Sequence, residues 1–249
     1  MQLHLCTIIP AGILVVFQFF PVIRYKALMV HRLNGWVVTL LLLVSNSGAL
    51  MIANRSFGGL YDTQVFVGIL AIFTTVSATL GVINIKRKQI DQHRKWMIRC
   101  WVYCGSIITL RFVQIAAANI VSQLGGFFIQ MNCGSIDFMG GNATYYPNCA
   151  VGGDSAYTAV EADFNTQVGV EEVAASLQMV FGQAGLIALV IHAVLVEVYF
   201  HLTPAESERL RRVSYERQLE RGHKHPGSSG LTSDRLGDAP WFQNTMEEK

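Results

Sequence analysis

The sequence predicts an all-α membrane protein, a polytopic bundle of about five transmembrane helices. Hydrophobic residues make up 51% of the 249 residues, and the mean hydropathy is positive. Only 14% of the residues are charged, whereas a soluble domain usually carries about 25%. The apolar residues are also gathered into separate long runs. The chain is therefore too apolar for a soluble globule of this length.

Five apolar runs are long enough to cross a bilayer, for which a helix needs about 20 residues. Each run is expected to be helical, because the backbone must satisfy its own hydrogen bonds in lipid. Residues 1–202 form the predicted bundle, and residues 203–249 form a charged cytosolic tail. The predicted spans are residues 3–23, 35–53, 64–85, 98–122 and 174–200.

Positive charge is distributed unevenly over the predicted connections. Of 19 Lys and Arg residues, three lie in 24–32, six in 86–99 and eight after Phe200. Five spans put these segments on one side, which the positive-inside rule assigns to the cytosol. The N-terminus and the 123–172 loop are then expected outside the cell or in a lumen. We expect an integral multi-pass protein of the endomembrane system or plasma membrane.

The 123–172 loop has features typical of a lumenal or extracellular segment. Cys133 and Cys149 would close a short ring if bridged, and disulfides persist in oxidising compartments. The alternative is two free thiols. Asn142-Ala143-Thr144 is an N-glycosylation sequon, which predicts a glycoprotein modified at Asn142.

The chain changes character after the fifth span. Residues His201–Arg221 are charged, with Pro204 near the start and Glu/Arg spacing that suits a short exposed helix. Residues His223–Lys249 are rich in Gly, Ser, Pro and charge, which predicts disorder.

Two short stretches resemble each other, MVHRLNGW and KRKQIDQHRKWMIR. Each contains a His-Arg pair, His31-Arg32 or His93-Arg94, followed by a Trp and a membrane-length apolar run. Two spans separate the pairs, so both are expected in cytosolic loops. Spans one-two and three-four are therefore predicted to be two copies of one hairpin.

A polar stripe continues from the second pair into the fourth span. At 100° per residue, His93, Cys100, Cys104 and Arg111 fall within about 20° of one line, and Gln114 lies beside it. Such a stripe should face the bundle interior. Arg111 is expected near the middle of its span, where an Arg costs about 2.5–3.5 kcal/mol. A partner, an anionic ligand or a water-filled cavity is therefore expected beside Arg111.

The fifth span carries its own polar positions. Gln178, Gly185 and His192 recur at seven-residue intervals and share one face, with His192 inside the membrane. Glu197 faces differently, and we expect it to pair with a basic residue at the cytosolic surface.

The paired histidines suggest a first hypothesis, a redox protein that binds b-type haem or a metal. His31 and His93 lie at one depth by topology, as bis-imidazole ligation requires. Arg32 and Arg94 could hold the haem propionates. The plainer alternative is that juxtamembrane His and Arg anchor helices at lipid head groups. A second haem would need another pair near the outer surface, where only His4 is found.

Two further hypotheses involve no redox chemistry. In one, the protein binds or transports a lipid or lipophilic metabolite, and Arg111, Gln114 and His192 line the cavity. In the other, it is a structural or assembly protein, self-associated or bound to a partner membrane protein through Arg111. The basic loops suit membrane lipids rather than nucleic acid. No Walker, Rossmann, HExxH or GxSxG motif occurs in a suitable context.

The chain resembles the predicted membrane proteins of domain of unknown function 2306 over roughly residues 3–120. The resemblance implies a helical membrane bundle and does not choose an activity or a ligand. It also supports the view that the His-Arg motifs form a site. The residues that carry it are His4, Gln18-Phe19, His31-Arg32-Leu33-Asn34-Gly35, His93-Arg94-Lys95-Trp96-Met97-Ile98-Arg99 and Leu110-Arg111.

Overall fold

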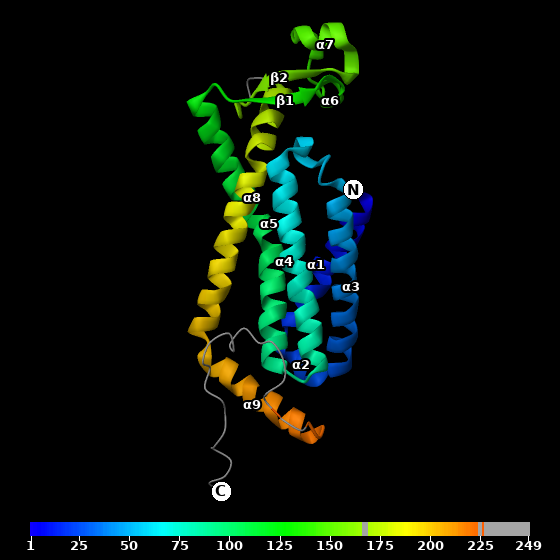
Figure 1. Ribbon diagram of the computed structural model, residues 1–249, viewed down its shortest axis with the longest axis vertical. Coiled ribbons are helices and arrows are strands. Elements are labelled where there is room, and N and C mark those ends of the chain that lie inside the picture. Colours follow the sequence, from blue (N-terminus) through cyan, green and yellow to red (C-terminus); the bar gives the residue numbers. More distant parts are fainter. Residues whose placement is uncertain (166–168, 224–225, 227–249) are drawn as a thin grey trace. The chain divides into compact units, whose positions relative to one another are not determined.

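The computed structural model describes residues 1–165, 169–223 and 226. Within them, five helices are long and apolar enough to cross a membrane. They correspond to the five predicted spans, so the membrane-bundle prediction is confirmed. These helices are α1 (Gln2–Phe19), α3 (Leu28–Ile52), α4 (Tyr61–Lys86), α5 (Ile90–Leu124) and α8 (Val170–Leu202) (Figure 1).

The first predicted span is divided at its end. Phe20 is extended (ψ 116°), as expected for a residue before proline, and Pro21 begins the short helix α2 (Pro21–Lys26). Helix α3 follows after one non-helical residue, Ala27. The expectation of a loop around His31 is therefore wrong, because that residue lies in the first turn of α3. His93 similarly lies in the first turn of α5.

The connection between α4 and α5 is short and hydrogen-bonded. Lys88 has a positive φ of 61°, the backbone conformation in which many helices end. The Lys88 N–H donates to the Ile85 carbonyl, and the Gln89 N–H donates to the Asn84 carbonyl. This Schellman pattern reverses the chain within three residues, and α5 begins at once.

The chain divides into two compact units, with the divisions falling inside α4, α5 and α8. The first unit comprises Met1–Ala71 and Gly105–Ile191, and the second comprises Ile72–Cys104 and His192–Lys249. The first unit thus contains α1 to α3, the 3₁₀ turn η1 (Ser56–Gly59) and the 123–172 segment.

In the first unit, α1 packs along α3. Near the N-terminus, His4 Nδ1 lies 2.8 Å from Ser45 Oγ and 3.1 Å from the Ser45 carbonyl oxygen. At the other end, the Asn34 side chain donates to the Leu14 carbonyl at 2.9 Å. These hydrogen bonds connect α1 to α3 near both ends of the pair. They fix the register of the two helices, which apolar faces alone would specify only weakly.

The 123–172 segment, expected to be a loop, forms a small disulfide-bonded subdomain. Strand β1 (Phe128–Asn132) pairs antiparallel with β2 (Tyr157–Glu161), and alternate residues of both strands are buried. Between the strands lie α6 (Cys133–Phe138), η2 (Ala143–Tyr145), α7 (Pro147–Gly152) and η3 (Gly153–Ser155). The expectation missed these elements because each is too short to give a periodic pattern.

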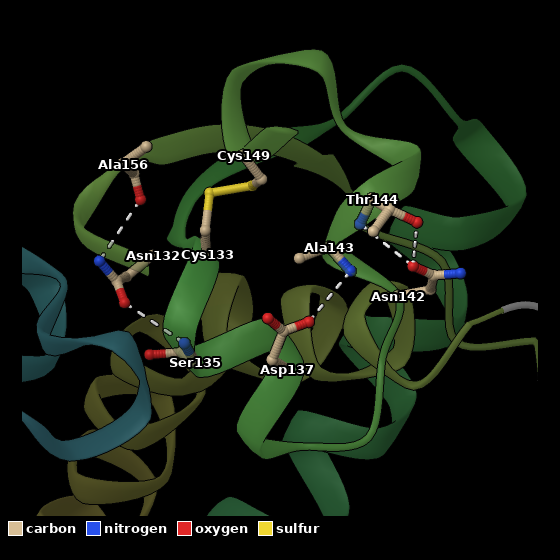
Figure 2. The surroundings of a disulfide bond; sticks show 9 residues. All are labelled: Asn132, Cys133, Ser135, Asp137, Asn142, Ala143, Thr144, Cys149 and Ala156. Carbon is tan, nitrogen blue, oxygen red and sulfur yellow. Dashed lines mark hydrogen bonds between the residues drawn. A yellow bond between two sulfur atoms is a disulfide. The ribbon is translucent and has the colours of Figure 1, made fainter. Parts of the chain in front are cut away.

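The predicted Cys133–Cys149 disulfide is confirmed (Figure 2). Both cysteines belong to a buried cluster that also contains Ala175 of α8. Burial, with the neighbouring Glu171 and Glu172 carboxylates, raises the pKa of Tyr146 to about 12. The exposed Asn142 side chain accepts hydrogen bonds from the Thr144 backbone and hydroxyl, and its glycosylation stays a prediction.

In the second unit, the predicted short helix is α9 (Pro204–Glu220). It was expected to be exposed, but Leu210, Ser214 and Gln218 are buried. Of the tail predicted to be disordered, residues 224–225 and 227–249 lie outside the described residues.

Candidate functional site

The second motif lies in the first turns of α5 and contacts α4 and α8. His93 Nδ1 donates to the Gly81 carbonyl of α4 at 2.8 Å. Met97 packs over the same glycine, where an added Cβ would come within 2.7 Å of the Met97 terminal methyl. Arg94 donates to the Tyr199 hydroxyl of α8 at 2.7 Å, and its guanidinium lies over that ring. The motif therefore joins three helices.

Arg99 is a buried cation of the motif. Its Nε donates to Glu197 Oε1 at 2.6 Å and its Nη2 to Glu197 Oε2 at 2.9 Å, a bidentate pair. The guanidinium also lies 4.8 Å from the ring centres of both Trp96 and Phe200. The Arg99 side chain is only 8% exposed, whereas the Glu197 side chain is 52% exposed. The expected pairing of Glu197 with a basic residue is thus confirmed.

Several polar atoms around this motif are buried without a hydrogen-bond partner in the described part of the chain. Three are N–H donors: Arg94 Nη1, Trp96 Nε1 and Arg99 Nη1. Two are acceptors at the α4–α5 connection: Asn84 Oδ1 and Gln89 Oε1. An unmet buried donor costs about 1–3 kcal/mol, so native structures usually supply water or a ligand. We therefore regard the start of α5 as the candidate binding site.

The predicted polar stripe faces α4 over its first two turns. His93 bonds to the Gly81 carbonyl, and the buried Cys100 donates its thiol to the Thr74 carbonyl at 3.4 Å. The two acceptors are seven residues apart on α4, matching the seven-residue spacing on α5. Here the stripe serves helix–helix packing, as polar residues in membrane bundles often do.

His192, predicted to line a ligand cavity, has a similar role in the second unit. Its Nδ1 donates to the Val102 carbonyl of α5 at 2.7 Å. Since a carbonyl can only accept, the Nδ1 nitrogens of both His192 and His93 carry the proton. Each imidazole is thereby fixed in orientation against a neighbouring helix.

The first motif makes fewer contacts. His31 is partly buried, its carbonyl accepts from Gln18 Nε2 at 3.2 Å, and its Nδ1 finds no partner among the described residues. Arg32 is exposed. His31 belongs to the first unit and His93 to the second, so the paired-histidine site stays a prediction. No group of three or more His, Cys, Asp and Glu in the described ranges could hold a metal ion.

Arg111 and Gln114, the other predicted ligand residues, do lie together in the first unit. Arg111 Nη1 donates to Gln114 Oε1 at 3.0 Å, and Gln114 Nε2 donates to the Leu177 carbonyl of α8 at 3.0 Å. The guanidinium lies 5.2 Å from the ring centre of Phe57 and 5.6 Å from that of Phe181. These two rings are stacked 3.9 Å apart.

The contact with Phe57 places the Arg111 guanidinium beside η1, the turn that connects α3 to α4. The depth of Arg111 in the membrane stays a prediction. Helix α5 has 35 residues, more than one crossing needs. A cation–π contact contributes about 0.5–2 kcal/mol, so the two rings and the hydrogen bond to Gln114 stabilise the Arg111 guanidinium within the chain.

Sequence reasoning missed Trp96, Arg99, Tyr199 and Phe200 as members of one site. A usable signal was present: Gln92, Trp96, Arg99 and Tyr103 recur at i, i+4, i+7 and i+11, which is one helical face beside the polar stripe. The stripe lies on the face that bonds to α4, whereas this second face carries Trp96 and Arg99, and Arg99 contacts Glu197 and Phe200 of α8.

Five membrane-length helices among the described residues define an integral, multi-pass helical membrane protein. A family model described as predicted membrane protein (DUF2306) matches residues 1–132, and the chain belongs to that family. The matched residues include both His-Arg motifs and Arg111.

One curated protein is similar over most of the chain. It is the Ava biosynthesis cluster protein G of Aspergillus versicolor, 24% identical over 237 residues, covering 81% of this chain and 69% of the relative. No solved structure matches the chain.

Proposed function

We propose that this protein binds a lipophilic small molecule with an anionic, acceptor-rich head group, and that the second motif holds that head. The observation that carries the proposal is the set of buried, unmet N–H groups of Arg94, Trp96 and Arg99. Arginine and indole N–H groups can only donate. Their natural complement is therefore a carboxylate, a phosphate or a cluster of carbonyl oxygens.

Charge at the site favours the same class of ligand. Arg94 and Arg99 both bring a positive charge, and Glu197 neutralises only the one on Arg99. Arg94 pairs with the neutral Tyr199 hydroxyl instead of a carboxylate. An anionic head group would complete this balance, and a charge-assisted hydrogen bond is about twice as strong as a neutral one.

The similarity to a biosynthesis cluster protein supports a small metabolite as the ligand. Membrane spans on both sides of the motif support a ligand with an apolar body. The proposal places the head group at the second motif and not at Arg111, because the second motif holds three buried N–H groups without a partner, whereas Arg111 is exposed and contacts Phe57, Phe181 and Gln114.

The test uses purified protein in nanodiscs of phosphatidylcholine, probed with decanoate and with decanol, which share a chain and differ in head group. We expect decanoate to raise the melting temperature and decanol to leave it unchanged. Trp96→Phe removes one N–H donor but keeps the ring that contacts Arg99, and should weaken the decanoate effect several-fold. Trp36→Phe is the matched control in the first motif.

Equal stabilisation by decanol, or an undiminished decanoate effect in the Trp96→Phe variant, contradicts the proposal. A third arm adds phosphatidic acid to the nanodiscs. If phosphatidic acid competes with decanoate, the natural ligand is a membrane lipid head group; if it does not, the ligand is a free metabolite.

A second candidate function is haem-linked redox chemistry, with His31 and His93 as ligands and Arg32 and Arg94 at the propionates. The hydrogen bond from His93 Nδ1 to a carbonyl supports it, since such a bond fixes the ring and directs Nε2 to a metal. The purified protein would then show a Soret band that His93→Ala removes. Absence of that band in protein expressed with added haem precursor excludes this candidate.

A further inference from the structure

Helix α9 caps the start of α5 with a side chain from elsewhere in the chain. Ser214 Oγ accepts hydrogen bonds from the backbone N–H of Ile90 at 2.9 Å and of Asp91 at 3.2 Å. These are the first two residues of α5, whose N–H groups have no partner within the helix. The residue preceding α5 is Gln89, which is not a usual capping residue. Ser214 supplies the missing cap.

The Ser214 hydroxyl also lies beside a carboxylate. Asp91 Oδ1 is 2.7 Å from Ser214 Oγ, and the Leu210 carbonyl is 2.9 Å away, so the hydroxyl proton is shared between two acceptors. Ser214 is 5% exposed and Asp91 is 8% exposed. The hydroxyl is therefore buried between the Asp91 carboxylate and backbone groups of α5 and α9.

The docking of α9 depends on a narrow stripe. Its buried residues are Leu210, Ser214 and Gln218, spaced four apart along one face. Gln218 Nε2 donates to the Arg87 carbonyl at 3.1 Å. Elements with few buried apolar contacts open locally at low free-energy cost. Transient detachment of α9 would expose Ser214.

The residues before Ser214 are Arg211, Arg212 and Val213. Two arginines at the third and second positions before a serine form the pattern that basophilic serine kinases bind through acidic pockets. The charge distribution of the chain predicts a cytosolic position for this segment, where nucleoside triphosphates and kinases are found.

We propose that Ser214 is a phosphorylation site for a basophilic serine kinase, and that the phosphate releases α9 from the α4–α5 connection. Ser214 Oγ attacks the γ-phosphorus of ATP, the bond to the β–γ bridging oxygen breaks, ADP leaves, and the hydroxyl proton passes to the kinase base. The product carries a charge of about −1.5 to −2 beside Asp91, and like charges at this distance repel. The proposal does not depend on the ligand proposed above.

The test treats the purified full-length protein with Mg-ATP and the catalytic subunit of cAMP-dependent protein kinase, and maps phosphate by mass spectrometry. We expect phosphate on Ser214 and none on Ser207, which lies in the same helix without arginines before it. The Arg211→Gln/Arg212→Gln double variant should be modified at least tenfold more slowly. A peptide of residues 204–220 serves as the positive control for the kinase.

Release of α9 is measured by hydrogen–deuterium exchange. Amides of 204–220 should exchange at least tenfold faster after phosphorylation and in Ser214→Asp, and Ser214→Ala should have a smaller effect because it adds no charge. Two results overturn the proposal: no phosphate on Ser214 under conditions that modify the peptide, or phosphate on Ser214 with unchanged exchange. Because phosphate is added to folded protein, a folding defect in Ser214→Asp does not prevent the test.

Discussion

The two His-Arg motifs begin α3 and α5 in the same way, yet their surroundings differ. In the first, Arg32 and Trp36 are exposed and His31 Nδ1 is buried without a partner in the described chain. In the second, Lys95 and Arg99 are buried. The shared His-Arg residues therefore mark the start of a helix. The residues packed against that start decide whether a buried polar site forms.

The close-approach glycine also differs between the two motifs. Gly35 lies on the motif helix itself, and an added Cβ would be 3.5 Å from Gln18 Oε1, an ordinary contact. In the second hairpin, the glycine is Gly81 of the preceding helix, beneath Met97 at 2.7 Å. The packing at Gly81 is therefore tighter than the packing at Gly35, and substitutions should separate the two glycines.

The largest difference is expected between Arg99→Leu and Arg32→Leu. Arg99→Leu removes the bidentate pair with Glu197 and two ring contacts. It should lower the free energy of unfolding by about 2–4 kcal/mol, less than for a fully buried pair because Glu197 is half exposed. Arg32→Leu should change it by less than about 0.5 kcal/mol. Denaturant unfolding in detergent measures both, and equal losses would show that the motifs are equivalent.

A smaller difference is expected at the glycines. Gly81→Ala forces the flexible Met97 side chain to move and should cost about 1–2 kcal/mol. Gly35→Ala has room for its methyl group and should stabilise α3 by about 0.5–1 kcal/mol through helix propensity. Melting temperatures in one detergent give the two signs. Rescue of Gly81→Ala by Met97→Val tests the cause, and a destabilising Gly35→Ala contradicts the proposed packing difference.

The histidines should differ by about as much as one hydrogen bond. His93→Leu loses the bond to the Gly81 carbonyl and should cost about 1 kcal/mol, whereas His31→Leu removes a buried atom without a partner and should be neutral or slightly stabilising. The same unfolding assay applies. If His31→Leu is the more damaging change, His31 has a bound partner in the membrane, as the haem hypothesis requires.

The smallest effect on stability is expected from Asn142→Gln. This variant tests the membrane topology, because the predicted spans place Asn142 on the side of the membrane opposite both motifs. In protein from a eukaryotic host, a glycosidase should shift the wild-type band, and Asn142→Gln should remove that shift with unfolding changed by less than about 0.5 kcal/mol. Asn54-Arg55-Ser56 is a second sequon, predicted to lie too close to the membrane to be modified, so the control variant Asn54→Gln is expected to have no effect. A sugar mapped to a sequon engineered into the tail would contradict the predicted topology, in which the tail is cytosolic.

The sequence was sufficient to predict the membrane bundle because lipid imposes two strong constraints, span length and internal backbone bonding. The disulfide could also be predicted from the position of Cys133 and Cys149 between two spans. Both predictions depend on local composition alone. The small strands around the disulfide were missed because five residues are too few to give a recognisable alternation, and their buried side belongs to a cluster that includes Ala175 of α8.

The candidate site was predicted only in part. The motif residues were singled out, but the partner of Arg99 depends on the rotation and depth of α8 relative to α5, which one sequence does not contain. The aromatic contacts of Arg111 were not predicted, because Phe57 and Phe181 come from other elements of the fold. The cation–π partner Phe57 lies in the turn η1, where the backbone has positive φ values. Such a turn has no periodic apolar pattern from which the position of Phe57 could be predicted.

The core of the disulfide subdomain includes residues of the long helices α5 and α8, which has a consequence for biogenesis. Its buried cluster includes Ala175 of α8, and Val121 of α5 packs against it. The subdomain core is therefore complete only after the ribosome has synthesised the start of α8 and both helices have entered the bilayer. Oxidation of Cys133 and Cys149 into a stable bond should follow insertion of the last span, so the oxidised thiol pair can serve as a maturation marker for correctly inserted chains.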